Sequence, residues 1–442
     1  MAELRGLHLL FLQGPAGLFF SRVANQLREA GAHVTKVNFN GGEDFYYRDE
    51  PIVRFHRSLE EWPDFFERLV RERNIDGIVL FGDCRPVHRA AIERARELGV
   101  EVFVFEEGYL RPDFVTLERG GVNGHSSIPR DPEFFANQAI VPERAHLPIE
   151  HAFFKSVVHT IFYACANALL KHRYPHYRHH RDIRPIVQMN LWLRGAYRRL
   201  VHTVRDRGFA ARLDAHDLPP YFFVPLQVHL DSQLKHSRYP TINAFIREVV
   251  QSFAEHAPPD NALVLKLHPM DRAYCDYSGE VQELRERYGL GERLIYVDIV
   301  NLPAALRGAR GTVVINSTTG LSSLTHGTPV KCLGRAVFDI PGLTHQGSLA
   351  EFWNDPAPVD RELYRRFRSW LREANQLNGS VWSCLHEHPA RLIKPVHNGA
   401  PRSTPPDVSS ASGFAASSAA LQHPVSLAPG ATPSEPQMLW KR

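Results

Sequence analysis

Three hydroxyl side chains stand where an apolar run ends and a helical pattern begins. Ser317, Thr318 and Thr319 follow the apolar run Val313–Ile315, and Gly320 precedes the helical spacing. The first turn of a helix has backbone N–H groups without intrahelical partners, and they carry partial positive charge. Hydroxyl donors and a glycine that admits a ligand close to the backbone suit an anion such as a phosphate. An ordinary hydroxyl N-cap is a compatible interpretation.

A second apolar run upstream, Ala262–Leu265, also ends in polar residues. Lys266 and the pair His268 and Pro269 follow it. An imidazole at a strand end can hydrogen-bond a phosphate and stabilise charge on a leaving group. The alternative for His268 is a hydrogen bond to the backbone. Because side chains alternate along a strand, Lys266 has two possible orientations, one of them toward the other face.

Length and composition limit the class of protein. A chain of 442 residues exceeds one ordinary core, so two domains are expected. A hydrophobic fraction of 43% and a charged fraction of 23% are typical of globular proteins. The net charge of +4 does not indicate nucleic-acid binding, and five scattered cysteines argue against a disulfide framework or a zinc site. The N-terminal residues lack a signal-peptide layout and no apolar run is long enough to span a bilayer, so any membrane contact is expected to be peripheral.

Strand and helix patterns alternate in two parts of the chain. His8–Gln13 is predicted to be a strand, followed by the glycine turn Gly14–Gly17 and a helix–strand pattern. This alternation is typical of parallel α/β sheets. We therefore predict Rossmann-like domains over 1–150 and 216–397. Residues 398–442, rich in Ser, Ala and Pro, are predicted to be a disordered tail.

The stretch between the two domains, 151–215, differs in character. Apolar residues recur at helical spacing from Phe153 to Leu170, and basic residues are frequent from Lys171 to Arg199. We predict a basic helical insert. One interpretation is a solvated charged face between domains, and the other is contact with a membrane surface or lipid head groups.

Four motifs in combination resemble one family. They are Phe105–Phe114, Leu226–Gln233, Lys266–Pro269 and Ser317–Gly320. Together they are similar to the bacterial capsule polysaccharide biosynthesis and export proteins, the β-Kdo transferases of ABC-transporter-dependent capsule systems. The resemblance runs from about residue 8 to 350 and is closest to the short, single-module members. It implies a GT-B-like α/β fold, with two Rossmann-like domains facing a cleft and the basic helical insert between them.

The resemblance also implies a reaction and its residues. Retaining transfer from CMP-β-Kdo by double displacement needs a carboxylate nucleophile. Gln227 and Asp231 match the family's Gln-x-x-x-Asp segment, and His268 matches a His-Pro motif of enzymes that use CMP-activated sugars. A helix cap is the alternative role for Asp231. The implied donor site contains Gln227, Lys266, Pro269, Ser317, Thr318, Thr319 and Gly320. Because CMP leaves with one phosphate, neither a metal ion nor a cofactor is expected.

The N-terminal half is predicted to hold the acceptor. Glu107 is the candidate general base, and an ion pair with Arg111 or Arg130 is its alternative role. The glycine turn lacks Gly-x-Gly-x-x-Gly spacing and is weak support for nucleotide binding. The stretch Gly120–Ser127 is predicted to be a mobile loop. The acceptor side is predicted to contain Gly14, Gly17, Tyr109 and Arg111.

The function implied is a retaining glycosyltransferase that moves Kdo from CMP-β-Kdo to a (lyso)phosphatidylglycerol-type lipid, starting the capsule polysaccharide linker for export. The expected partners are the CMP-sugar donor, the lipid acceptor, the anionic inner-membrane surface and other capsule assembly and export proteins, but not nucleic acid. The expected location is cytoplasmic and peripheral on the inner face of the inner membrane. The alternatives are a non-catalytic export adaptor that binds the lipid-linked glycan, and an epimerase or UDP-sugar transferase.

Overall fold

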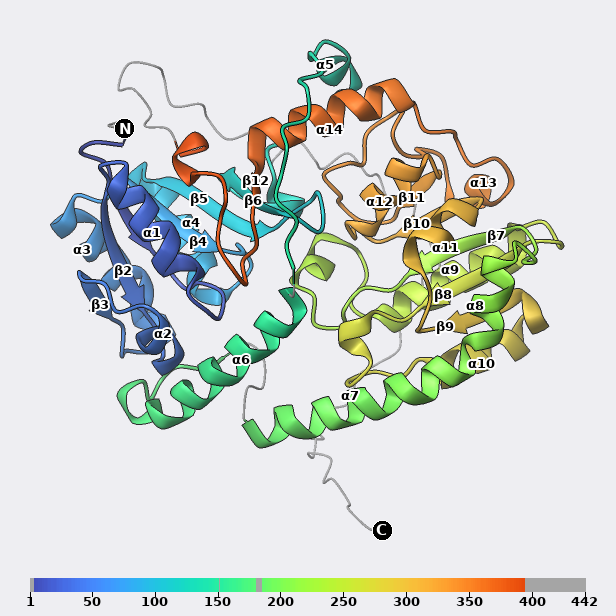
Figure 1. Cartoon of the computed structure of the whole chain (residues 1–442), viewed down its shortest axis with the longest axis horizontal. Helices are drawn as coiled ribbons and strands as arrows, with labels where there is room; N and C mark the ends of the chain where they lie inside the picture. Colours follow the sequence, from blue (N-terminus) through green and yellow to red (C-terminus); the bar gives the residue numbers. More distant parts are fainter. Residues whose placement is uncertain (1–3, 151, 180–184, 394–442) are drawn as a thin grey trace, which may run out of the picture. The chain divides into compact units, whose positions relative to one another are not determined.

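Two β-sheets organise the chain (Figure 1). The computed structural model of the protein describes residues 4–150, 152–179 and 185–393. Within these ranges one sheet has seven strands and the other has five. The predicted disordered tail, 398–442, lies outside the described residues.

The first sheet has the strand order β12-β6-β5-β4-β1-β2-β3. Its parallel strands are β1 (His8–Phe11), β2 (His33–Asn38), β3 (Ile52–Arg54), β4 (Gly77–Phe81) and β5 (Glu101–Glu107). Two strands are antiparallel to their neighbours: β6 (Phe114–Arg119) pairs with β5, and β12 (Gln376–Asn378) pairs with β6. The order reverses between β1 and β4. Ligands of such sheets bind at this reversal, beyond the carboxyl ends of the strands.

The second sheet is parallel throughout, with the order β11-β10-β7-β8-β9. Its strands are β7 (Tyr221–Pro225), β8 (Ala262–Lys266), β9 (Leu294–Val297), β10 (Gly311–Val314) and β11 (Val330–Cys332). Every residue of β7 and β8 is buried, as expected for central strands that are covered on both faces. Here the order reverses between β7 and β10, which gives this sheet a second position suited to a ligand.

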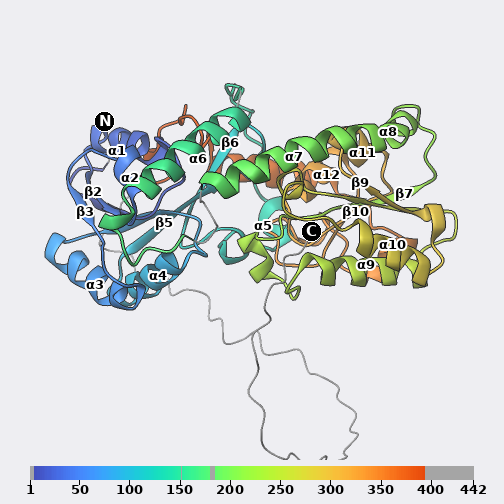
Figure 2. The same cartoon turned by 90° about the horizontal axis from the view of Figure 1, so that it is seen from below.

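Helices cover both faces of each sheet (Figure 2). On the first sheet, α1 (Phe19–Glu29) lies on one face, and α3 (Trp62–Arg73) and α4 (Pro86–Leu98) lie on the other. On the second sheet, α9 (Ile242–His256) and α10 (Ser278–Arg287) oppose α8 (Arg207–Asp214) and α11 (Leu302–Gly308). The predicted α/β fold of the GT-B type, with two Rossmann-like sheets, is confirmed.

A further apolar core joins segments from both sheets. Tyr109 and Phe114 share it with Leu321, Phe338 and Phe367. Its helices are α5 (Pro132–Ala136), α12 (Thr319–His326) and α14 (Arg361–Asn375), and α13 (Leu349–Asn354) packs on the second sheet.

After α14 the chain returns to the first sheet as β12, because Leu377 is buried there beside Val115. Part of the predicted C-terminal domain, 216–397, therefore belongs to the first sheet. The described residues form one compact unit.

The region between the sheets is helical, as predicted. It contains α6 (Ala152–Leu169) and α7 (Pro185–Arg205), which contact each other. α6 packs closely on α2 (Gly41–Tyr46), where a Cβ at Gly42 would lie 2.6 Å from the Tyr163 ring. No helix within the ranges that the structure describes is long and apolar enough to cross a membrane.

Candidate active site at the carboxyl ends of the strands

Two buried amides join the strand ends at the reversal of the second sheet. Gln227 follows β7 and Asn316 follows β10. Gln227 Nε2 donates to Asn316 Oδ1 over 2.9 Å, and the Asn316 backbone N–H donates to Gln227 Oε1 over 3.3 Å. Asn316 Nδ2 also donates to the Gln233 carbonyl over 2.9 Å. These bonds link the loop that carries Asp231 to the loop that carries Ser317.

Asp231 has both a structural bond and a bond to this amide pair. Its Oδ1 caps the 3-10 turn η4 (Ser232–His236) by accepting from Gln233 N over 2.9 Å. Its Oδ2 accepts from Gln227 Nε2 over 3.3 Å. The cap considered from the sequence is therefore present. Since a carboxylate has about four lone-pair sites, the two bonds orient the half-buried group and leave it able to react.

The hydroxyl run stands at the start of α12, which begins at Thr319. Thr318 is its N-cap residue, without a side-chain cap bond. Ser317 Oγ instead accepts from Thr319 N over 3.3 Å and donates to Thr319 Oγ1 over 3.2 Å. A Cβ at Gly320 would lie 2.4 Å from Phe338 Cζ. The space beside Gly320 is thus occupied by the Phe338 ring, so packing accounts for a glycine at this position.

His268 and Lys266 have different surroundings, although both follow from β8. His268 Nδ1 accepts from Met270 N over 3.2 Å at the start of the turn η5 (Pro269–Asp271). Burial lowers the pKa of His268 to about 4, and the charges of Lys266 and Arg111 act in the same direction. Near neutral pH the ring is therefore uncharged, and a ring that accepts at Nδ1 carries its proton on Nε2. His268 is suited to donate one hydrogen bond there.

Lys266 points into the protein interior. Its Nζ donates to the Leu267 carbonyl over 2.9 Å. Burial lowers the pKa of Lys266 to about 8, although the nearby charges of Asp298 and Asp206 raise it. The Lys266 ammonium is thus bonded to the backbone at the end of its own strand, and its charge lowers the pKa of His268.

A small pocket lies beside these strand ends. Its empty volume, part of which is open to solvent, is about 190 Å³. It is lined by Tyr109, Asn123, Gln233, Asn316, Thr318, Arg335, Ala336, Val337 and Phe338. The pocket thus combines residues that follow β5 and β6 with residues from the loops after β7 and β10.

Two neighbouring glutamates end β5 and face opposite ways. Glu107 forms an ion pair with Arg111 over 2.8 Å, which is the alternative role considered for it. Glu106 lies near Gly82, and burial raises the pKa of its carboxyl group to about 7, with the charges of Glu107, Asp231 and Asp83 acting in the same direction. A carboxyl group with a pKa near 7 is suited to accept or give a proton at neutral pH.

The glycine turn lies under α6. A Cβ at Gly17 would lie 3.3 Å from the His159 ring, and Gly14 N donates to the buried Glu43 carboxylate over 3.2 Å. Nearby, the Tyr163 hydroxyl accepts from Asn40 Nδ2 over 2.7 Å. Both glycines of the turn are therefore in contact with protein atoms, Gly17 with α6 and Gly14 with α2.

Tyr109 is buried and holds a neighbouring loop. Its hydroxyl accepts from Asn123 N over 2.7 Å, and its own N–H donates to Gln376 Oε1 over 3.0 Å. Val122 N donates to Asp83 Oδ2 over 3.0 Å. The stretch Gly120–Ser127, predicted to be mobile, is thus fixed at two successive backbone groups.

The comparison with protein families agrees with the four motifs. The model of the capsule polysaccharide biosynthesis protein family matches residues 76–382. The chain belongs to this family. The capsule polysaccharide export protein KpsS of Escherichia coli is 39% identical over 376 residues, which cover 85% of this chain and 97% of that protein. The capsule polysaccharide modification protein LipB of Neisseria meningitidis serogroup A is 39% identical over 406 residues, covering 90% and 95%.

Among solved structures, this capsule protein is similar to KpsC of Thermosulfurimonas dismutans, a β-Kdo 2,7 transferase. The two are 17% identical, with a TM-score of 0.40, over 81% of this chain and 89% of that one.

Sequence reasoning about this capsule protein missed three groups beside the site: Asn316, Glu106 and a His–Asp pair. The pair is His229 and the buried Asp271, joined by a 2.7 Å contact at His229 Nδ1 and by a 2.8 Å bond from His229 N. Glu106 could have been found from the sequence. Because side chains alternate along β5, Glu106 and Glu107 face opposite sides of the sheet, so each is a separate candidate for the base.

Proposed function

We propose that this capsule polysaccharide biosynthesis protein is a retaining β-Kdo transferase. It takes Kdo from CMP-β-Kdo and transfers it to a (lyso)phosphatidylglycerol-type lipid, which starts the linker for polysaccharide export. The observation that carries the proposal is the hydrogen bond between Gln227 and Asp231. It belongs to a network that also binds Asn316, so the carboxylate is linked to the loop that leads into α12, where the strand order reverses.

The first step is attack by an Asp231 carboxylate oxygen on the anomeric carbon of Kdo. A glycosyl–aspartyl bond forms, the bond from the anomeric carbon to the phosphate oxygen breaks, and its electron pair leaves with CMP. The uncharged His268 ring donates from Nε2 to the departing phosphate. The hydroxyls and the positive end of the helix dipole at the start of α12 stabilise the same charge.

The second step transfers the sugar to the lipid. The acceptor hydroxyl attacks the anomeric carbon, the bond to Asp231 breaks, and a general base takes the hydroxyl proton. Glu107 is the base predicted from the sequence. Glu106 is the stronger candidate, because Glu107 is paired with Arg111 whereas the carboxyl pKa of Glu106 is about 7.

An apolar stripe on α7 supports a membrane-bound acceptor. Its six side chains are 55% to 72% exposed and recur every three or four residues: Ile186, Met189, Leu193, Tyr197, Leu200 and Val204. α7 has no acidic residue between Pro185 and Arg205, while Arg194 and Arg199 are exposed. An amphipathic helix with a basic face and a solvent-exposed apolar stripe is suited to lie on an anionic bilayer. We therefore propose that α7 binds the membrane surface from which the lipid acceptor is taken.

The decisive test is the substitution Asp231→Asn. Asparagine caps a turn about as well as aspartate, so the fold of η4 is retained while the nucleophile is lost. We expect transfer from CMP-Kdo to a fluorescent lysophosphatidylglycerol to fall by at least about 10³-fold, as for other nucleophile deletions. In the unsubstituted protein, mass spectrometry should find a Kdo adduct on the peptide that contains Asp231.

Asp214→Asn, at an exposed position at the end of α8, is the matched control and should retain normal transfer. Retained transfer in Asp231→Asn would refute the mechanism. An export adaptor without enzyme activity would produce neither a Kdo-modified lipid nor an adduct in the unsubstituted protein. A transferase that uses a UDP-sugar as its donor would be inhibited by UDP rather than by CMP.

A further inference from the structure

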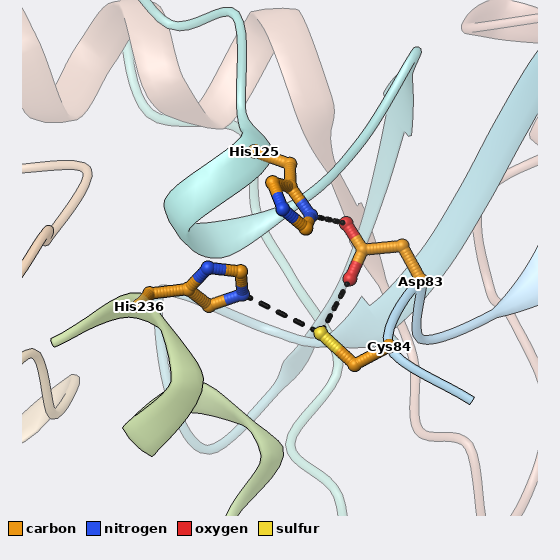
Figure 3. A group of neighbouring side chains, drawn as sticks. All are labelled: Asp83, Cys84, His125 and His236. Atoms are coloured by element: carbon orange, nitrogen blue, oxygen red, sulfur yellow. Dashed lines mark hydrogen bonds and ion pairs between the residues drawn. The ribbon is translucent and has the colours of Figure 1, made fainter. Parts of the chain in front are cut away.

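Four potential metal ligands from three distant segments converge beside the first sheet (Figure 3). Asp83 and Cys84 follow β4 at the reversal of strand order. His125 ends the turn η2 (Asn123–His125), and His236 ends η4. One ligand atom from each residue lies within 4.8 Å of all the others.

The spacing of these atoms fits a tetrahedral ion. Asp83 Oδ2 lies 3.0 Å from His125 Nδ1, Asp83 Oδ1 lies 3.2 Å from Cys84 Sγ, and Cys84 Sγ lies 3.4 Å from His236 Nε2. Bonds of about 2.0–2.3 Å from Zn²⁺ to N, O and S ligands place tetrahedral ligand atoms roughly 3.3–3.7 Å apart. These three contacts are slightly shorter than or within that range, and all four ligand atoms lie within 4.8 Å of one another, so the cluster is of the right size for one ion.

The surrounding backbone favours this arrangement. Asp83 is buried, and its Oδ2 also accepts from Val122 N over 3.0 Å, which orients the carboxylate. A Cβ at Gly124 would lie 2.3 Å from the His236 ring, and a Cβ at Gly121 would lie 2.8 Å from His125 Cβ. Glycines at these two positions let both imidazoles approach the carboxylate and the thiol.

The donor set selects the class of metal. One thiolate and one carboxylate neutralise a divalent cation, and two imidazoles complete four-coordination. Imidazole and thiolate ligands favour Zn²⁺, whereas Mg²⁺ and Ca²⁺ prefer oxygen ligands. A site with four protein ligands has no open position for a substrate, so its role is structural.

We propose that Asp83, Cys84, His125 and His236 bind one Zn²⁺ ion. Binding releases the thiol proton of Cys84 and replaces the hydrogen bonds among the four side chains by metal–ligand bonds. His236 and Asp231 lie at opposite ends of η4. The ion therefore ties the turn that carries Asp231 to the first sheet, whatever reaction the protein performs.

The test uses the full chain, purified without a metal-binding tag, stripped with a chelator and then dialysed against Zn²⁺. Mass spectrometry of metals should find about one equivalent per chain. Co²⁺ in place of Zn²⁺ should give a thiolate-to-metal charge-transfer band. Cys84→Ser, which is nearly isosteric, and His236→Ala should each weaken Zn²⁺ binding by at least about tenfold.

Cys275→Ser is the matched control, because Cys275 belongs to the cluster with His229 and Asp271 and should not affect the Zn²⁺ content. Circular dichroism checks that each variant is folded, and Cys84→Ser keeps the test valid if His236→Ala does not fold. Less than about a tenth of an equivalent in the unsubstituted protein would overturn the proposal. A full equivalent that survives Cys84→Ser, or Co²⁺ binding without the thiolate band, would also overturn it, because the ion would then lie elsewhere among the 24 histidines.

Discussion

Gly320→Ala distinguishes two roles of the glycine at the start of α12: packing against Phe338 and admission of a ligand. The added Cβ would lie 2.4 Å from Phe338 Cζ, 2.5 Å from Phe338 Cε2 and 3.4 Å from Val314 Cγ2. Favourable carbon–carbon contacts are about 3.5–4.0 Å, so the Phe338 ring must retreat by about 1 Å. The ring is buried and has little room to do so.

The expected cost follows from these contacts. Overpacking of this kind costs about 1–3 kcal/mol, and the better helix propensity of alanine returns at most about 1 kcal/mol. Urea denaturation should therefore show Gly320→Ala to be less stable by about 1–2 kcal/mol. Phe338→Leu in the same chain should relieve the clash, so the double-mutant cycle should give a favourable coupling of about 1–2 kcal/mol.

The matched control is Gly279→Ala in the first turn of α10, where a Cβ meets nothing within 4 Å. It should be neutral or stabilise the protein by up to about 1 kcal/mol. If Gly320 instead admits a ligand, Gly320→Ala should leave stability unchanged and abolish CMP binding measured by calorimetry. That result, or additive effects of Gly320→Ala and Phe338→Leu, would refute the packing role.

Three further predictions follow from His268, Glu106 and the α7 stripe. The pKa of His268, about 4 in the folded state against 6.5 ordinarily, means that the unfolded chain binds more protons between pH 6.5 and 4. The free energy of unfolding therefore falls as the pH is lowered through this window. In urea denaturation, this fall should be smaller in His268→Gln than in the unsubstituted protein by on the order of 1–3 kcal/mol. An equal fall in the two proteins would contradict the prediction. If Glu106 is the base, kcat/KM should rise with pH through about 7. This rise should disappear in Glu106→Gln but remain in Glu107→Gln. A rise that persists in Glu106→Gln would exclude Glu106 as the base. Leu193→Asp with Leu200→Asp should weaken co-sedimentation with anionic vesicles by about tenfold or more, whereas unchanged binding would exclude the α7 stripe as the membrane contact.

The central strands of both sheets could be predicted from the sequence because they are buried on both faces and appear as continuous apolar runs. β12 could not. It has three residues, and its pairing with β6 depends on the return of the chain after α14. The strand β6 begins at Phe114, the last residue of the motif that contains Glu107, and its antiparallel pairing likewise depends on contacts between segments.

The candidate site was predictable where chemistry follows a strand end. Asp231, His268 and Ser317 occupy such positions, and these ends meet because the strand order of an α/β sheet brings its loops together. The cover of α6 over Gly17 was not predictable, since it depends on packing between distant segments. The four proposed zinc ligands also lack the close spacing that marks a metal site in a sequence.

The turn η4 links the two proposals physically. At its start Asp231 is held by Gln227, which is bound to Asn316 at the end of β10. At its end the His236 ring contacts Cys84, which follows β4 of the other sheet. The backbone carbonyl of His236 accepts a hydrogen bond from Arg335 N over 3.0 Å. A nucleophile must be held close to its reactive geometry, and small displacements reduce rates strongly. Fixing both ends of this short turn is therefore a direct way for the two sheets to position one carboxylate.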